Sequence, residues 1–113
     1  MIARSMWLTV SMMALACAHV QAQESTVARG NEVFRDWCAP CHAPGARHPG
    51  TQALEALYKG AKPAALEQRT DLLPELTRAF VRTGVSVMPP FRKTEISDAD
   101  LEALAAYLAP KPR

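Results

Sequence analysis

A Cys-x-x-Cys-His motif limits the fold of this chain more than any other feature. Residues 37–42 are Trp-Cys-Ala-Pro-Cys-His, which brings the thiols of Cys38 and Cys41 onto one turn with the imidazole of His42 beside them. Such a turn suits covalent haem attachment, in which each thiol adds to one vinyl group of the porphyrin and the histidine ligates the iron. It also suits a redox-active dithiol that forms a reversible disulfide. The remaining sequence must distinguish the two.

The first 22 residues have the pattern of an export signal. Arg4 supplies a positive charge, residues 6–18 are mostly apolar or small, and residues 20–22 (Val-Gln-Ala) fit a cleavage site. The apolar run is shorter than the about 20 residues that span a bilayer. We therefore predict a signal peptide over residues 1–22, a periplasmic location and no stable membrane insertion after cleavage. The alternative is an uncleaved anchor.

The predicted mature chain, residues 23–113, is small and nearly neutral. Of the charged side chains only Arg4 is removed with the signal, so 12 Lys and Arg remain against 11 Asp and Glu among 91 residues. This balance argues against nucleic acid as a partner. A chain of this length buries a limited core, so a disulfide or a large apolar cofactor is expected to help stabilise it.

Apolar periodicity predicts an all-α domain of four to five short helices. The first is expected to begin at Thr26, after a frayed end at 23–25, and to run to about residue 37. A loop over 43–50 follows, and further helices are expected near 53–58, 63–68 and 74–83, with the last from Ser97 to about residue 109. No segment alternates convincingly with a period of two. The sequence therefore predicts no sheet.

The helical pattern favours haem over the other chemistries of the motif. A thioredoxin-like dithiol needs a buried strand before the Trp-Cys pair, whereas residues 30–36 have a charged, helical pattern. A zinc site needs four well-placed ligands, and His42 directly adjoins Cys41. A plain disulfide between cysteines three residues apart closes a very small loop and constrains little of the unfolded chain.

His42 and Met88 are the predicted axial ligands of the iron. Met88 is the one methionine left after cleavage, and it lies in an apolar loop, residues 85–91. Imidazole and thioether together suit an electron-transfer haem. His48 is a weaker alternative, because a residue so close to His42 reaches the opposite porphyrin face with difficulty. Pro49 is predicted to accept the Nδ1 proton of His42 through its carbonyl, with a plain turn proline as the alternative.

Over nearly all of the mature sequence, the chain resembles the small class I cytochromes c. Their haem motif matches residues 38–42, and their methionine loop is similar to residues 88–91. The family packs its first and last helices crosswise through one pair of residues on each helix. Gly30 and Phe34 resemble the pair on the first helix, and Leu104 and Tyr107 resemble the pair on the last. The resemblance implies a cytochrome c fold around one covalent haem c with its iron. One departure is that the usual glycine-rich run before the loop proline is Ala-Arg-His here, at residues 46–48.

The resemblance implies an electron carrier rather than an enzyme, cycling between Fe(II) and Fe(III) and serving redox partner proteins. Residues 80–84, leading to Met88, are similar to the cytochrome subunits of flavocytochromes such as p-cresol methylhydroxylase, which implies a flavin dehydrogenase subunit as donor; a free carrier is the alternative. A haem enzyme or ligand sensor with a dissociable Met88 is the alternative from another class.

Two sets of side chains are expected near the haem. The first is apolar and is expected to line the haem pocket: Leu54, Leu57, Phe80, Val85, Val87 and Phe91. The second is basic, flanks the methionine loop, and is expected to steer an acidic partner: Arg82, Arg92 and Lys93.

Overall fold

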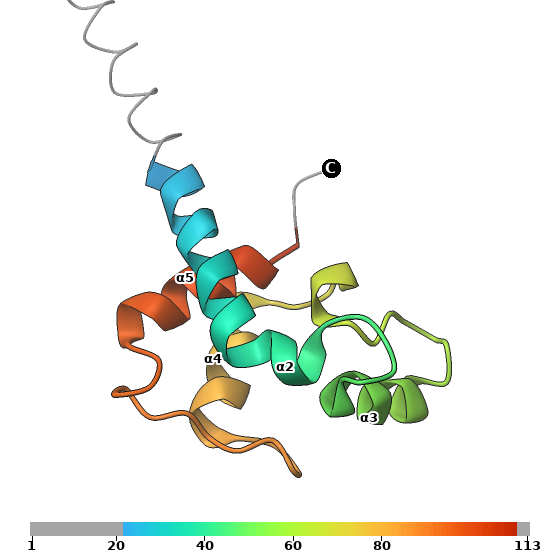
Figure 1. Cartoon of the computed structure of the whole chain (residues 1–113). Helices are drawn as coiled ribbons and strands as arrows, with labels where there is room; N and C mark the ends of the chain where they lie inside the picture. Colours follow the sequence, from blue (N-terminus) through green and yellow to red (C-terminus); the bar gives the residue numbers. More distant parts are fainter. Residues whose placement is uncertain (1–21, 111–113) are drawn as a thin grey trace, which may run out of the picture.

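The computed structural model describes residues 22–110, which form helices joined by loops (Figure 1). Within this range the only extended pairing is an isolated bridge between Val85 and Met88. The prediction of an all-α domain is therefore confirmed. None of the helices in this part of the chain is both long and apolar enough to cross a bilayer. The predicted signal peptide, except for its last residue, lies outside the described residues.

One continuous helical segment carries the Cys-x-x-Cys-His motif. Residues 22–33 are helical, and the chain continues through the π-helix η1 (Phe34–Cys38) into α2 (Ala39–His42). The predicted frayed end at 23–25 and the predicted helix start at Thr26 are wrong. The Thr26 hydroxyl instead donates to the carbonyl of Ala22 at 2.9 Å, as a threonine inside a helix does.

Local signals fix the ends of the other helices. Pro74 begins α4 and Ser97 caps α5 by accepting a hydrogen bond from the Asp100 amide at 3.1 Å. Pro49 likewise begins its helix, four residues before the predicted start, so the preceding loop is shorter than expected. The bounds are α3 (Pro49–Tyr58), the 3₁₀ turn η2 (Leu66–Gln68), α4 (Pro74–Thr83) and α5 (Asp98–Leu108).

The first helical segment crosses α5 at Gly30 (Figure 1). A Cβ atom on Gly30 would lie 2.1 Å from the carbonyl oxygen of Ala103 and 2.6 Å from Cβ of Tyr107. One turn later, the rings of Phe34 and Tyr107 pack with their centroids 5.8 Å apart, and Leu104 is fully buried. The predicted crosswise packing is confirmed, and it explains a glycine that costs helix propensity.

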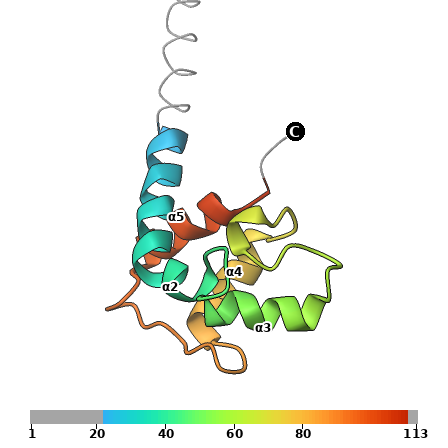
Figure 2. The same ribbon diagram turned by 45° about the vertical axis from the view of Figure 1, so that its right-hand side comes forward.

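The hydrophobic core extends from this helix crossing to α4. Helix α4 packs along α5, and α3 lies beside the end of α2 (Figure 2). The buried residues form one cluster, which we call the core cluster: Val33, Phe34, Cys38, Leu72, Val81, Ile96, Leu101, Leu104 and Leu108. Because Cys38 belongs to this cluster, the first cysteine of the motif is anchored in the core of the domain.

Candidate functional site

The two motif cysteines occupy different environments. Cys38 is buried and Cys41 is exposed, and neither forms a disulfide. Burial, and to a lesser extent the neighbouring Cys41, raises the pKa of the Cys38 thiol to about 12. Thiol–disulfide exchange needs a thiolate, so a thiol that stays protonated at neutral pH is poorly suited to it. The environment of Cys38 thus favours a structural or attachment role over a dithiol active site.

His42 ends α2 with its ring half-buried. Burial lowers the pKa of His42 and so favours the neutral imidazole, which is the form that ligates metals. Its Nδ1 atom is buried and has no hydrogen-bond partner. The hydrogen bond that we expected from Nδ1 to the Pro49 carbonyl is therefore not formed in this structure, and the role of Pro49 stays a prediction. A buried, unpartnered ring fits a residue that binds a group other than protein.

Gly50 is a site residue that the sequence reasoning missed. A Cβ atom there would lie 2.7 Å from Cε1 and 2.9 Å from Nδ1 of His42, and 2.8 Å from the carbonyl oxygen of Cys41. The first turn of α3 therefore packs directly against the imidazole, and only glycine leaves room for it. The signal in the sequence was a glycine directly after Pro49, inside a helix, where propensity disfavours it.

Two hydrogen bonds fasten α3 to the motif. The buried Thr51 hydroxyl donates to the carbonyl of Ala43 at 2.9 Å. The ring of His48 is held by a hydrogen bond of 3.1 Å between its Nδ1 atom and the carbonyl of Pro40. The imidazole of His48 is thus engaged on the motif's own helix. This contact favours a structural role for His48 over the ligand role that we considered.

The Met88 loop has a defined conformation. Val85 and Met88 exchange two backbone hydrogen bonds, of 3.1 and 2.9 Å, across a tight turn in which Ser86 has a φ of 52°. Gly84 precedes the turn with a φ of 69°, and a Cβ atom there would lie 2.7 Å from the Met88 carbonyl oxygen. This close approach explains the glycine at the end of α4.

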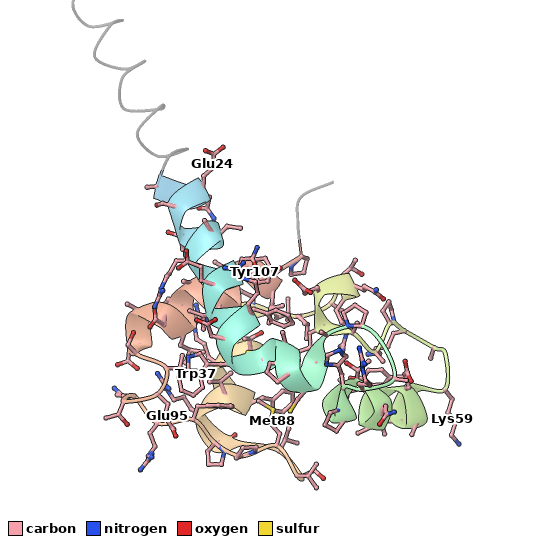
Figure 3. The ribbon with its side chains drawn as sticks, viewed as in Figure 1. Glu24, Trp37, Lys59, Met88, Glu95 and Tyr107 are labelled. Atoms are coloured by element: carbon pink, nitrogen blue, oxygen red, sulfur yellow. The ribbon has the colours of Figure 1, made fainter. Side chains whose placement is uncertain are left out.

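The structure brings the loop and the motif to the same core. Met88 is half-buried and packs against the core cluster that contains Cys38; its side chain is labelled in Figure 3. Beyond Met88, the Phe91 ring meets the Trp37 ring edge-on, with centroids 6.0 Å apart. Residues from the motif and from the Met88 loop, two segments about 50 positions apart, therefore contact one core cluster.

The predicted pocket residues are only partly buried. Leu54 and Phe91 are half-buried, whereas four others are exposed: Leu57, Phe80, Val85 and Val87. Two thiols, a neutral imidazole and a thioether are a donor set that fits a haem c.

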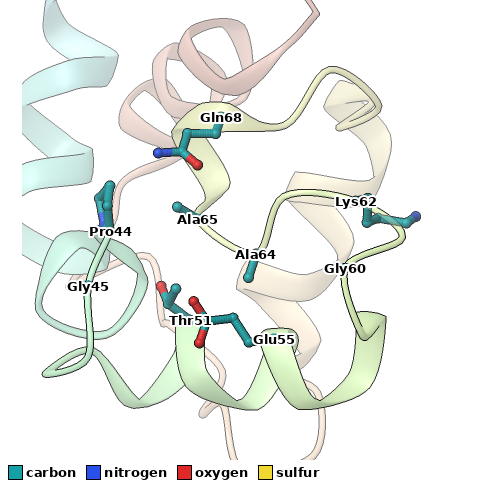
Figure 4. A pocket seen from close by; sticks show the side chains of 9 residues that line it. All are labelled: Pro44, Gly45, Thr51, Glu55, Gly60, Lys62, Ala64, Ala65 and Gln68. Carbon is teal, nitrogen blue, oxygen red and sulfur yellow. The ribbon is translucent and has the colours of Figure 1, made fainter.

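A separate cavity lies outside this set of residues. It measures about 160 Å³ and lies between the loop after the motif, α3 and residues 60–68 (Figure 4). Thr51, Glu55 and Lys62 are among its lining residues, and none of the predicted ligands is. The cavity is therefore distinct from the predicted site.

The basic residues near the loop are paired within the chain. Arg82 and Lys93 both bind the carboxylate of Asp98, at 2.9 and 2.6 Å, and Arg92 lies 3.4 Å from Glu95. The expected steering of an acidic partner by these residues is weakened accordingly, because each positive charge has a carboxylate of its own chain beside it.

Comparison with known proteins identifies the family. The model of the family described as "Cytochrome C oxidase, cbb3-type, subunit III", a c-type cytochrome domain, matches residues 25–108, which is nearly all of the described chain. No curated protein and no solved structure matched the chain significantly. The match agrees with the helical fold, with the crossing at Gly30 and with the motif at the junction of η1 and α2. The chain belongs to this family: it is a small c-type cytochrome with a cytochrome c fold, a covalently bound haem c and a role in haem-based electron transfer.

Proposed function

We propose that this cytochrome is a periplasmic electron carrier in which Cys38 and Cys41 attach the haem, and His42 and Met88 ligate its iron. The observation that carries the proposal is the position of Met88, which packs on the same core cluster as Cys38. When bound, the haem supplies an iron that takes up and releases one electron at a time. The protein residues supply its attachment and surroundings.

Each proposed ligand has support of its own in the fold. Burial favours the neutral imidazole of His42, and the first turn of α3 packs against its ring at Gly50. Met88 is held by a turn with two backbone hydrogen bonds and by a glycine that lets its carbonyl approach closely. Two protein ligands leave no axial position for a substrate, which favours a carrier over an enzyme. Pro49 remains the proposed acceptor for the Nδ1 proton of His42.

The cellular setting is part of the proposal. Residues 1–22 act as a cleaved export signal, and residues 23–113 form the cytochrome domain. The electron donor is a dehydrogenase, and the similarity of residues 80–84 to flavocytochrome subunits supports a flavoprotein. Co-purification with a flavoprotein would support that donor, and a stable monomer reduced equally well by small donors would count against it.

The test is the absorption spectrum of protein matured in the periplasm, with Met88→Ala compared with wild type. The wild type is expected to carry covalent haem and a ferric methionine–iron charge-transfer band. The variant is expected to keep the haem, lose the band and have a lower reduction potential, because a thioether ligand raises the potential. Val87→Ala is the matched control, since Val87 is 90% exposed beside Met88 and its truncation should leave the band intact.

Two results would refute the proposal. A Met88→Ala protein that keeps the charge-transfer band would show that another residue is the ligand. Ready binding of carbon monoxide to the reduced wild type at neutral pH would instead indicate a haem enzyme or ligand sensor with an open iron.

A further inference from the structure

Arg82 lies at the base of the loop that carries Met88. It belongs to the last turn of α4, and its side chain is 23% exposed. Its Nη1 donates to the carbonyl of Phe91 at 3.1 Å, and its Nη2 donates to Asp98 at 2.9 Å. Phe91 is three residues beyond Met88, and Asp98 is the first residue of α5. One guanidinium therefore joins α4, the end of the loop and the start of α5.

After Met88, few backbone groups of the loop can donate a hydrogen bond that holds it in place. Pro89 and Pro90 have no amide proton, so neither can donate a backbone hydrogen bond. Phe91 is the first residue that can, and its amide donates to the carbonyl of Val81 at 2.8 Å. The carbonyl of Phe91 receives Arg82. The amide and the carbonyl of Phe91 are thus both hydrogen-bonded to α4, and Arg82 forms one of these two bonds.

We propose that Arg82 is the positioning residue for Met88: by holding the Phe91 carbonyl against α4 and Asp98, it keeps the thioether placed as an axial ligand. The inference rests on the proposed function, in which Met88 ligates the iron. A guanidinium donating to a carbonyl forms a charge-assisted bond, which is stronger than a neutral one. Loss of this bond is expected to let the end of the loop move away from α4, and Met88 with it.

The fold offers a close control for this role. Arg78 lies one turn earlier on α4 and binds Glu102 of α5 through two hydrogen bonds, of 2.7 and 2.6 Å. It joins the same two helices as Arg82, and it has no hydrogen bond to the loop. Lys93 also binds Asp98, at 2.6 Å, so this carboxylate keeps a cation when Arg82 is replaced. Replacing Arg82 should therefore report mainly the lost bond to the Phe91 carbonyl.

The experiment compares haem-loaded, ferric wild type with Arg82→Gln and Arg78→Gln. Imidazole is titrated as an external ligand that displaces Met88, and the loss of the methionine–iron charge-transfer band is followed. Arg82→Gln is expected to bind imidazole about tenfold more tightly than wild type, because a charged hydrogen bond that holds the loop is lost. Arg78→Gln is expected to bind it as wild type does, with a similar small loss of thermal stability.

Three outcomes would overturn the inference. Imidazole affinity unchanged in Arg82→Gln would show that the bond does not position Met88. An equal gain of affinity in both variants would assign the effect to general loosening of α4 against α5. A wild type that lacks the charge-transfer band would refute the proposed ligation itself, before any variant is compared, and the inference would fall with it.

A second variant covers the case in which Arg82→Gln does not fold. Arg82→Lys keeps a positive charge near Asp98, but it lacks the planar fork that reaches two acceptors at once. It is expected to bind imidazole more tightly than wild type and less tightly than Arg82→Gln. Wild-type affinity in Arg82→Lys would mean that charge alone suffices and that the bond to the carbonyl is not needed.

Discussion

Replacing Gly30 with alanine tests the crossing between the first helical segment and α5. The added methyl group would lie 2.1 Å from the Ala103 carbonyl oxygen, whereas real Cβ contacts are essentially never closer than 3.0 Å. The obstacle is backbone, so no rotamer change can relieve the clash. The two helices must move apart, and the packing of Phe34 on Tyr107 must change with them.

The expected loss of stability follows from two opposing effects. Overpacking a well-packed core typically costs about 1–3 kcal/mol, and the rigid backbone obstacle places this site at or above the upper end of that range. Alanine regains about 1 kcal/mol of helix propensity over glycine. The net loss is about 2 kcal/mol, which corresponds to a fall of about 10 °C in the unfolding temperature of a domain of this size.

The assay is unfolding of the haem-loaded protein by heat and by denaturant, followed by circular dichroism. Asn31→Ala is the matched control, because Asn31 is the next residue along the same helix and is exposed. It gains helix propensity without a clash and should be slightly more stable than wild type. A Gly30→Ala protein as stable as wild type would refute the close crossing.

Two further predictions follow from other contacts. Gly50→Ala places a methyl group 2.7 Å from Cε1 of His42, so we expect lower thermal stability of the haem-loaded protein and a changed ferric spectrum; a spectrum identical to wild type would contradict the contact. Hydrogen-bonded ion pairs with Lys93 and Arg82 lower the pKa of Asp98, and one with Arg29 lowers the pKa of Asp100. The stabilising effect of these ion pairs is therefore present above the unfolded-state pKa of about 3.9 and is lost as the pH falls through the lower folded value. Unfolding temperatures measured from pH 6 to pH 2 should therefore fall below about pH 4, and less steeply at high salt.

The most informative residues in the sequence were those whose backbone preference conflicts with the structure that the surrounding pattern predicts. Gly30 lies on the apolar stripe of a helix, where glycine is unfavourable, and the structure shows that the Ala103 carbonyl needs that space. The loop predicted over residues 85–91 contains Pro89 and Pro90, which disfavour regular structure, and the structure has a turn and a loop there. The structural role of such residues can be inferred from sequence, because each is unfavourable for the structure around it and therefore needs a reason.

The features that the sequence did not reveal depend on contacts between residues far apart or on hydrogen bonds that the sequence does not show. Arg82 looked like a surface charge for docking, because its partners Phe91 and Asp98 lie 9 and 16 residues further along. Gly50 needs no unusual backbone angle, so only the proximity of the His42 ring explains it. The helix start was placed wrongly at Thr26, since a threonine that bonds back to an earlier carbonyl has the same sequence signature as a cap.

The π-helix η1 decides which changes in length the chain between the crossing and the haem motif can absorb. The Ala39 amide bonds to the carbonyl of Phe34, five residues back, so this turn holds one residue more than an α-helical turn. Deleting one residue between Phe34 and Cys38 would remove this extra residue and restore α-helical bonding, so Cys38 and His42 would keep nearly their present direction relative to Gly30. An insertion has no such turn to absorb it, and one residue of an α-helix corresponds to a rotation of about 100°. The stretch is therefore expected to tolerate one deletion, whereas an insertion would turn the haem-attachment residues away from the helix packing.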